Sequence, residues 1–228
     1  MDFKEAMRQR HMVRRYMDRP LPAETVKELD RYVDKMNQSY GLAVELKTED
    51  SSAFNAVIKL VLAKGVRNFF VMAGKDAPDL DERLGYCGAG LMLYAQTLGL
   101  NTWWVGGTFN RKRMTEISHG NRVAGVVTVG YGQTQGVPHK TRRPEQVGSY
   151  SGDEPEWFRR GIEAALLAPT ALAKQAFMIT GSGNKVSIRC DNGIFSGVDT
   201  GLVKYHFELG AGKSLRKESK VVQTKKQL

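Results

Sequence analysis

The chain has 228 residues, a hydrophobic share of 41% and a charged share of 25%, which suit one globular unit of moderate size and exclude a fibrous protein. No apolar run reaches the roughly 18–20 residues that a bilayer crossing needs, so we expect no membrane partner. The formal net charge of +10 leaves nucleic acid or a small anion open as a ligand.

Hydrophobic periodicity predicts helices and strands mixed along the whole chain. Helices are expected at 2–10, from Pro20 or Pro22 to Gln38, from Ser51 to Gly65, at 79–98, after Asn110, at 154–167 and at 197–209. Strands are expected at 43–48, 68–73, 102–105, 123–130, 175–181 and 185–190, the last two joined as a hairpin through Gly183 and Asn184. Small residues within 86–90 favour close helix packing. Helices and strands are therefore expected throughout the chain.

The stretch 132–152 is rich in Gly, Pro and Ser and is typical of a linker. Residues 90–99 and 201–210 share Gly, Leu, Tyr, Leu and Gly at identical offsets, 201 − 90 = 111 positions apart. We therefore expect a single domain over 1–212 with two pseudo-repeated halves, about 1–131 and 153–212. A basic tail over 213–228 is expected to be solvated or disordered.

Two compact basic groups lie outside that tail. One holds Arg8, Arg10, Arg14 and Arg15, and the other holds Lys140, Arg142 and Arg143. Each group is a candidate phosphate site, and each is equally well explained as a solvated face.

Other motifs give no catalytic assignment. The GKS at 212–214 lacks the earlier glycine of a phosphate-binding loop, and no GxGxxG or GxSxG is present. The four histidines have no metal-ligand spacing, so no metal is expected. Cys87 and Cys190 stand far apart, and the charged N-terminus does not resemble a signal peptide, so a reducing, cytoplasmic location is expected. A bound redox cofactor, which carries its own reactive atom, becomes the favoured hypothesis.

Four segments in chain order resemble the FMN-dependent nitroreductase family. They are 10–16 (RHMVRRY) followed by 18–22 (DRPLP), 98–107 (LGLNTWWVGG), 126–132 (VVTVGYG) and 139–144 (HKTRRP). The segment 168–177 (APTALAKQAF) resembles the family's APSxxNxQPW element, which in ordinary members stands much earlier in the chain. This order is similar to that of a smaller branch of nitroreductases, in which one chain supplies parts that two subunits supply elsewhere.

The resemblance implies a nitroreductase-like α+β fold, with an antiparallel or mixed central sheet flanked by helices, and one FMN per chain. Arg10, Lys140 and Arg142 would bind the phosphate, Arg14 would stabilise the reduced ring, and Gly106-Gly107 would offer a backbone N–H to flavin N5. Met12 and Ala173 stand where the family has serine and asparagine. The remaining implied contacts are Val105, Pro169, Thr170, Ala171 and Gln175, the last of which fits a solvent-facing strand position equally well.

The implied activity is transfer of hydride from NADH or NADPH to FMN and then to an electron-poor small molecule such as a nitroaromatic or quinone. Protein side chains would position and tune the flavin, and none would form a bond. The alternatives are an enone or azoline acceptor, a non-catalytic flavin-binding or sensing protein, and a nucleic-acid-binding protein that uses the basic tail. The chain is expected to be a monomeric pseudo-dimer or a homodimer.

Overall fold

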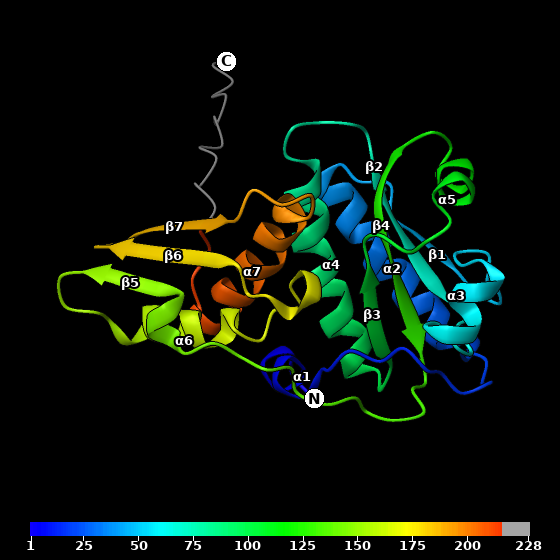
Figure 1. The fold of residues 1–228 in the computed structure, drawn as a ribbon, viewed down its shortest axis with the longest axis horizontal. Coiled ribbons are helices and arrows are strands. Elements are labelled where there is room, and N and C mark those ends of the chain that lie inside the picture. Colours follow the sequence, from blue (N-terminus) through cyan, green and yellow to red (C-terminus); the bar gives the residue numbers. More distant parts are fainter. Residues whose placement is uncertain (216–228) are drawn as a thin grey trace, which may run out of the picture.

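The computed structural model describes residues 1–215. Figure 1 shows two sheets at opposite ends of the molecule, with helices α4 (Leu80–Thr97) and α7 (Ser196–Ala211) packed against each other between them. This arrangement is the α+β fold, with antiparallel and mixed sheets flanked by helices, that the sequence predicts.

The larger sheet is antiparallel throughout and has the strand order β1-β2-β4-β3. Its strands are β1 (Glu45–Lys47), β2 (Phe69–Gly74), β3 (Asn101–Val105) and β4 (Arg122–Gly130). Every residue of β2 is buried, because alternate side chains enter two different clusters: Phe70 and Met72 pack with α4, whereas Phe69 and Val71 pack beneath Phe54. A strand covered on both faces is expected to read as a continuous apolar run.

The first half holds four more helices. They are α1 (Phe3–Gln9), α2 (Ala23–Tyr40), α3 (Ala56–Val61) and α5 (Arg111–Ile117). Asp2, Asn55 and Asn110 accept a hydrogen bond from a backbone N–H of the first turn of α1, α3 and α5, respectively, which satisfies donors that a helix start leaves free.

The smaller sheet has the order β5-β6-β7 and comes from the last third of the chain. Strand β5 (Gly148–Ser151) pairs in parallel with β6 (Phe177–Ser182), and β6 pairs antiparallel with β7 (Lys185–Cys190). Helix α6 (Glu156–Ala165) packs on α7, and short 3₁₀ turns occupy η1 (Pro144–Gln146) and η2 (Ala171–Ala173). The predicted hairpin is confirmed, with Gly183 in the left-handed region at its turn.

Glycines set the approach of α4 to α7. A Cβ on Gly201 of α7 would overlap the carbonyl oxygen of Glu82 on α4, and one on Gly85 would overlap the carbonyl oxygen of Val198. The two backbones therefore touch directly, which only glycine allows at these positions. The backbone contact lies at Gly85, just before the stretch 86–90 for which close packing was expected; within that stretch, Gly90 faces the rings of Tyr32 and Tyr205.

Three details differ from the sequence prediction. Strand β5 and turn η1 lie inside the stretch 132–152 that composition marks as a linker. Helix α3 begins at Ala56 and not after Ser51, because Asn55 caps it. Strand β6 begins at Phe177, since Gln175 has a left-handed backbone with φ of 49°. The pseudo-repeat stays a prediction.

The start of the predicted tail folds back on the body. Lys213 lies over the ring of Trp157 at 3.8 Å, and the Leu215 N–H donates to Glu208 at 2.8 Å. The predicted boundary at 213 stays a prediction, and the part of it that concerns 216–228 lies outside the described residues. None of the described helices has the length and hydropathy to cross a membrane.

Candidate functional site

The segment after α1 runs beside β3 and brings the first basic group to that strand. Met12 forms an isolated bridge with Thr102, and the Val13 N–H donates to the Thr102 carbonyl at 3.2 Å. The chain after β4 then returns along the same segment, with the Gln133 N–H donating to the carbonyl of Arg15 at 2.9 Å.

At Gly136 the chain that leads to the second basic group comes into close contact with the first basic group. It has a φ of 74°, and a Cβ there would lie 2.8 Å from the Cβ of His11. The residues that precede the second basic group are thus packed against the first group, although 125 positions separate His11 from Gly136 (136 − 11).

Arg10 is a buried cation without a counter-ion. Its side chain is 5% exposed, and its Nε has no hydrogen-bond partner. Burial lowers the pKa of Arg10 to about 10, and no ion pair involves it among residues 1–215. A charge held out of water without a partner is strongly unfavourable, so this guanidinium is suited to an anionic ligand.

Arg10 acts electrostatically on two imidazoles, those of His11 and His206. Burial, Arg10 and His139 all lower the pKa of His11. Burial, together with Arg10 and His139, lowers the pKa of His206 to about 3, although the hydrogen bond to the Leu202 carbonyl opposes that shift. In the described part of the chain no carboxylate contributes to any of these shifts, so the cluster is electropositive.

Gln175 ties the second basic segment to the second half of the molecule. It is 1% exposed. Its Oε1 accepts from the backbone N–H of Arg142 at 2.7 Å, and its Nε2 donates to the carbonyl of Leu166 at 2.7 Å and to Thr141 at 3.1 Å. The solvent-facing alternative for Gln175 is therefore wrong, and its amide is already engaged.

The segment before β6 is held by Asp199 at the start of α7. The Ala171 N–H donates to Asp199 Oδ1 at 2.9 Å and to Oδ2 at 3.2 Å. Burial raises the pKa of Asp199 to about 6, although the bond from Ala171 opposes that shift. Leu172 and Ala173 both have a φ above 50°, a strained choice for residues with a Cβ.

The neighbours of that loop follow from the same fold. Pro169 is half-buried after α6, and Thr170 is buried, with its Oγ1 accepting from the Gln175 N–H at 3.1 Å. Ala173 is exposed, so its side of the η2 turn is open to solvent.

The end of β3 meets the start of α7. Val105 is buried, and a Cβ on Gly106 would lie 2.6 Å from the ring of Phe195. Phe195 also comes within 3.8 Å of the Cβ position of Gly107. The glycine pair therefore leaves room for an aromatic ring.

The other predicted site residues are exposed. Met12 is 47% exposed, and Arg14 lies over the Trp103 ring at 5.0 Å. Lys140 and Arg142 are exposed, and neither has an ion-pair partner within residues 1–215.

These contacts join every predicted segment into one circuit. Residues 10–13 pair with β3, and the end of β3 contacts Phe195 at the start of α7. From α7, Asp199 accepts the hydrogen bond from Ala171, and Gln175 accepts the one from Arg142. Gly136, just before the second basic group, packs against His11 and closes the circuit. A chain of contacts thus links the two basic groups, which the sequence alone left unconnected.

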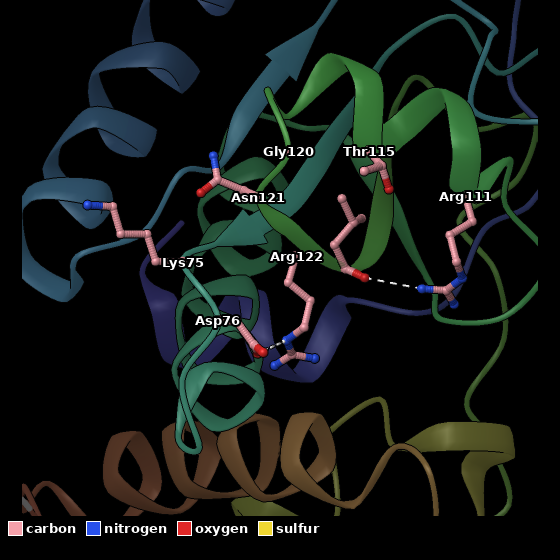
Figure 2. A pocket seen from close by; sticks show the side chains of 8 residues that line it. Lys75, Asp76, Arg111, Thr115, Gly120, Asn121 and Arg122 are labelled. Atoms are coloured by element: carbon pink, nitrogen blue, oxygen red, sulfur yellow. Dashed lines mark hydrogen bonds and ion pairs between the residues drawn. The ribbon is translucent and has the colours of Figure 1, made fainter.

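Two cavities lie elsewhere. One, of about 570 Å³, is lined by Lys75, Arg111 and Arg122, among others, and Figure 2 shows Arg122 paired with Asp76 and Arg111 turned to the carbonyl of Val123. The other, of about 530 Å³, is lined by Glu145, Glu154, Glu156 and Glu163, whose charge disfavours a phosphate. Neither includes a predicted site residue.

Sequence reasoning missed His206, Phe195 and the structural role of Gln175. A single histidine in an apolar helix carries no signal of its own, and its neighbours come from α1 and the chain before η1, far away in sequence.

Comparison with known proteins places this geometry in a family. Residues 2–211 match the sequence model described as "Putative TM nitroreductase". The chain belongs to this nitroreductase family. Its membership supports an oxidoreductase function, and none of the curated protein sequences matches the chain.

Solved nitroreductases share the fold. A "putative nitroreductase" from Thermotoga maritima has a TM-score of 0.65 at 17% identity, covering 94% of this chain and 87% of that one. Proteins from Desulfovibrio desulfuricans and Exiguobacterium sibiricum, both solved in complex with FMN, have TM-scores of 0.52 at 15% and 13% identity. They cover 68% and 64% of this chain and 98% and 95% of their own. At these identities the likeness shows the fold alone.

Proposed function

We propose that this protein is an FMN-dependent oxidoreductase that takes hydride from NADH or NADPH and reduces an electron-poor small molecule such as a nitroaromatic or quinone. The observation that carries the proposal is Arg10, a buried guanidinium that has no counter-ion among the described residues and stands at the position that the family resemblance assigns to the flavin phosphate. Family membership and the FMN-bound structural relatives support it.

The residues fit a flavin phosphate. A phosphate monoester carries close to two negative charges at neutral pH and accepts several hydrogen bonds. Arg10 would supply the charge-assisted donors, and its orphaned Nε shows unused donor capacity. Lys140 and Arg142 would add two exposed cations, and Gln175 fixes the backbone between them and the second half.

The residues near Gly106 and Thr170 fit a flat ring. FMN would supply the atom that accepts and returns hydride, so the protein needs to hold and tune the ring. Arg14, steadied by Trp103, would offset negative charge on the reduced ring. Gly106 and Gly107 would expose backbone N–H groups, and Pro169, Thr170 and Ala171 would contribute from the second half.

A non-catalytic flavin-binding or sensing protein is the second candidate, and Phe195 favours it. The Phe195 ring rests on Gly106, where a ring and its substrate would otherwise find open backbone. Met12 and Ala173 also remove two polar contacts that the family uses. In this alternative the flavin is bound and shielded from donors.

Absorbance under nitrogen separates the two candidates. The purified protein, incubated with FMN and freed of excess, should carry oxidised-flavin bands that NADH or NADPH bleaches and that a quinone or nitroaromatic restores. Oxidised-flavin bands that persist after NADH and NADPH have been added would favour the sensing protein. Absence of retained flavin would refute both.

We also infer a reducing, cytoplasmic environment, which the two free cysteines support, and one FMN per chain in a monomeric pseudo-dimer or a homodimer. Gel filtration at known concentration, with the flavin-to-protein ratio of the eluted peak, tests this part of the proposal.

A further inference from the structure

The start of α7 places an aromatic ring against the glycine pair that follows β3. A Cβ on Gly106 would lie 2.6 Å from Cε1, 3.0 Å from Cδ1 and 3.3 Å from Cζ of Phe195, and one on Gly107 would lie 3.8 Å from Cζ. Any side chain at position 106 would meet this ring, so the bare backbone of glycine is what lets the ring approach. The Phe195 ring therefore lies where the proposed function places the reacting end of the flavin.

The backbone of Phe195 is held by its contacts with neighbouring elements. The Asp199 N–H donates to the Phe195 carbonyl at 2.9 Å, which closes the first turn of α7. A Cβ on Gly197 would lie 2.7 Å from the Cβ of Asp81 on α4, so the two helices are in direct contact there. Asp81 also pairs with Arg122 of β4 at 2.9 Å. Phe195 thus belongs to the anchored start of a helix.

The same turn of α7 also contacts the loop before β6. Asp199, one helical turn after Phe195, accepts a hydrogen bond from the Ala171 N–H at 2.9 Å. The proposed function assigns the flavin ring to contacts with this loop and with Gly106 and Gly107. The first turn of α7 therefore touches both segments that would hold the ring.

Phe195 lies outside the core. It belongs to none of the hydrophobic clusters of the described chain, and no other aromatic ring there pairs with it. Phe54, Phe158 and Phe207, in contrast, each pack in a cluster and pair with another ring. Phe195 is half-buried, and the preceding Ile194 is 89% exposed. The ring is therefore available to a ligand that is itself aromatic.

We propose that Phe195 is a specificity-determining residue that forms one side of the acceptor-binding site and selects flat aromatic acceptors. The ring of a quinone or nitroaromatic packs on Phe195 beside the flavin, and acceptors without an aromatic or quinonoid ring gain nothing from this contact. Phe195 binds the acceptor and takes no part in the transfer of electrons. The inference rests on the proposed function and names fused-ring aromatics as the preferred acceptors.

Steady-state kinetics of the FMN-loaded full chain test the proposal with two acceptors. Menadione is a flat fused-ring quinone, whereas ferricyanide accepts electrons without an aromatic ring. Phe195→Leu keeps an apolar side chain but removes the ring, so its KM for menadione should rise about 2- to 12-fold, the range expected for loss of an aromatic pair. Its kcat with menadione and its kinetics with ferricyanide should stay close to those of the wild type.

Two further variants control for the loss of a ring as such. Phe195→Tyr keeps the ring and should keep the wild-type KM for menadione. Phe3→Leu removes another half-buried phenylalanine ring, on α1, and should leave the KM for both acceptors unchanged.

Inhibition of the wild-type protein tests the same contact without relying on the folding of any variant. Naphthamide is flat and is not reduced, so it should compete with menadione. Its fully saturated analogue, which is similar in size but not flat, should inhibit at least several-fold less. In Phe195→Leu the two amides should inhibit about equally.

An unchanged KM for menadione in Phe195→Leu, or equal inhibition of the wild type by the two amides, would overturn the role of Phe195 and leave the proposed function intact. Loss of FMN from Phe195→Leu, with FMN retained by Phe3→Leu, would also overturn it, because the ring would then hold the flavin and not the acceptor. A wild-type protein that retains no FMN, or whose flavin neither NADH nor NADPH bleaches, would instead refute the proposed function.

Discussion

Arg10 carries an energetic cost in the flavin-free protein. A guanidinium that is 5% exposed and lacks a carboxylate partner gives up hydration without an equivalent gain. A residue kept for stability would not be arranged in this way, whereas a residue kept for an anion would be.

Replacing Arg10 by Met should therefore have opposite effects on stability and binding. The free energy of unfolding of the flavin-free protein should rise by about 1–3 kcal/mol, because the buried charge is gone. FMN affinity should fall by about 1.5–3 kcal/mol, the value of a charged hydrogen bond. Urea unfolding and fluorescence titration measure the two. Arg8→Met, exposed on the same helix, is the matched control, and a destabilised Arg10 variant with normal FMN affinity would contradict the assignment.

Asp199 gives a pH-dependent prediction at the same scale. Its pKa is raised to about 6 in the folded protein from an ordinary value of 3.8, so the folded state holds the proton longer than the unfolded state. This contribution favours folding below about pH 4 and is lost as pH rises through 6. Asp199→Asn should become more stable relative to wild type by about 1–3 kcal/mol between pH 4.5 and 7.5. A constant difference across that range would show that Asp199 is not perturbed.

At the scale of elements, the crossing of α4 and α7 organises the molecule. The two helices touch backbone to backbone at Gly85 and Gly201, and the start of α7 carries Phe195 and Asp199 to the candidate site. Any shift at this crossing moves the second half of the site relative to the first.

Gly201→Ala tests this crossing. Alanine is a better helix former than glycine by about 1 kcal/mol, but its Cβ would overlap the Glu82 carbonyl, which cannot rotate away. We expect a net loss of about 1–3 kcal/mol in the free energy of unfolding, together with weaker FMN binding. Gly193→Ala, where a Cβ meets open space, should change stability by less than about 0.5 kcal/mol. Equal behaviour of the two variants would refute direct backbone contact.

Gln175 also links two elements, because its amide is hydrogen-bonded both to the chain before η1 and to the end of α6. Gln175→Leu would leave the Arg142 N–H and the Leu166 carbonyl without their partners, at a cost of about 1–3 kcal/mol. Hydrogen exchange should show faster exchange at residues 139–143, and unchanged protection there would contradict the role of Gln175. Gln38→Leu, which alters an exposed amide on α2 away from this segment, is the control.

At the scale of the whole molecule, local sequence patterns predicted most helices and strands but not the contacts between them. Strand β2 is a continuous apolar run, and α1 and α5 begin at capping residues, so their existence follows from short stretches of sequence. Strand β5 is a half-exposed Gly-Ser-Tyr-Ser that is ordered by pairing with β6, which no local pattern reveals. The cluster of Arg10 with His206 depends on the packing of α1 against α7 and was equally invisible.

The two halves also differ in structure. The sequence echo falls on α4 and α7, which pack together, but the sheets beside them have four and three strands and different pairing. The cationic residues come from the first half and from the chain that joins the halves. This asymmetry supports the inference of one FMN per chain.

A crystal structure of the protein with FMN tests the central claim most directly. We predict one FMN per chain, its phosphate hydrogen-bonded to Arg10, and its ring between Gly106 and the segment that contains Thr170. A phosphate bound elsewhere, with Arg10 still buried and unpaired, would contradict the account.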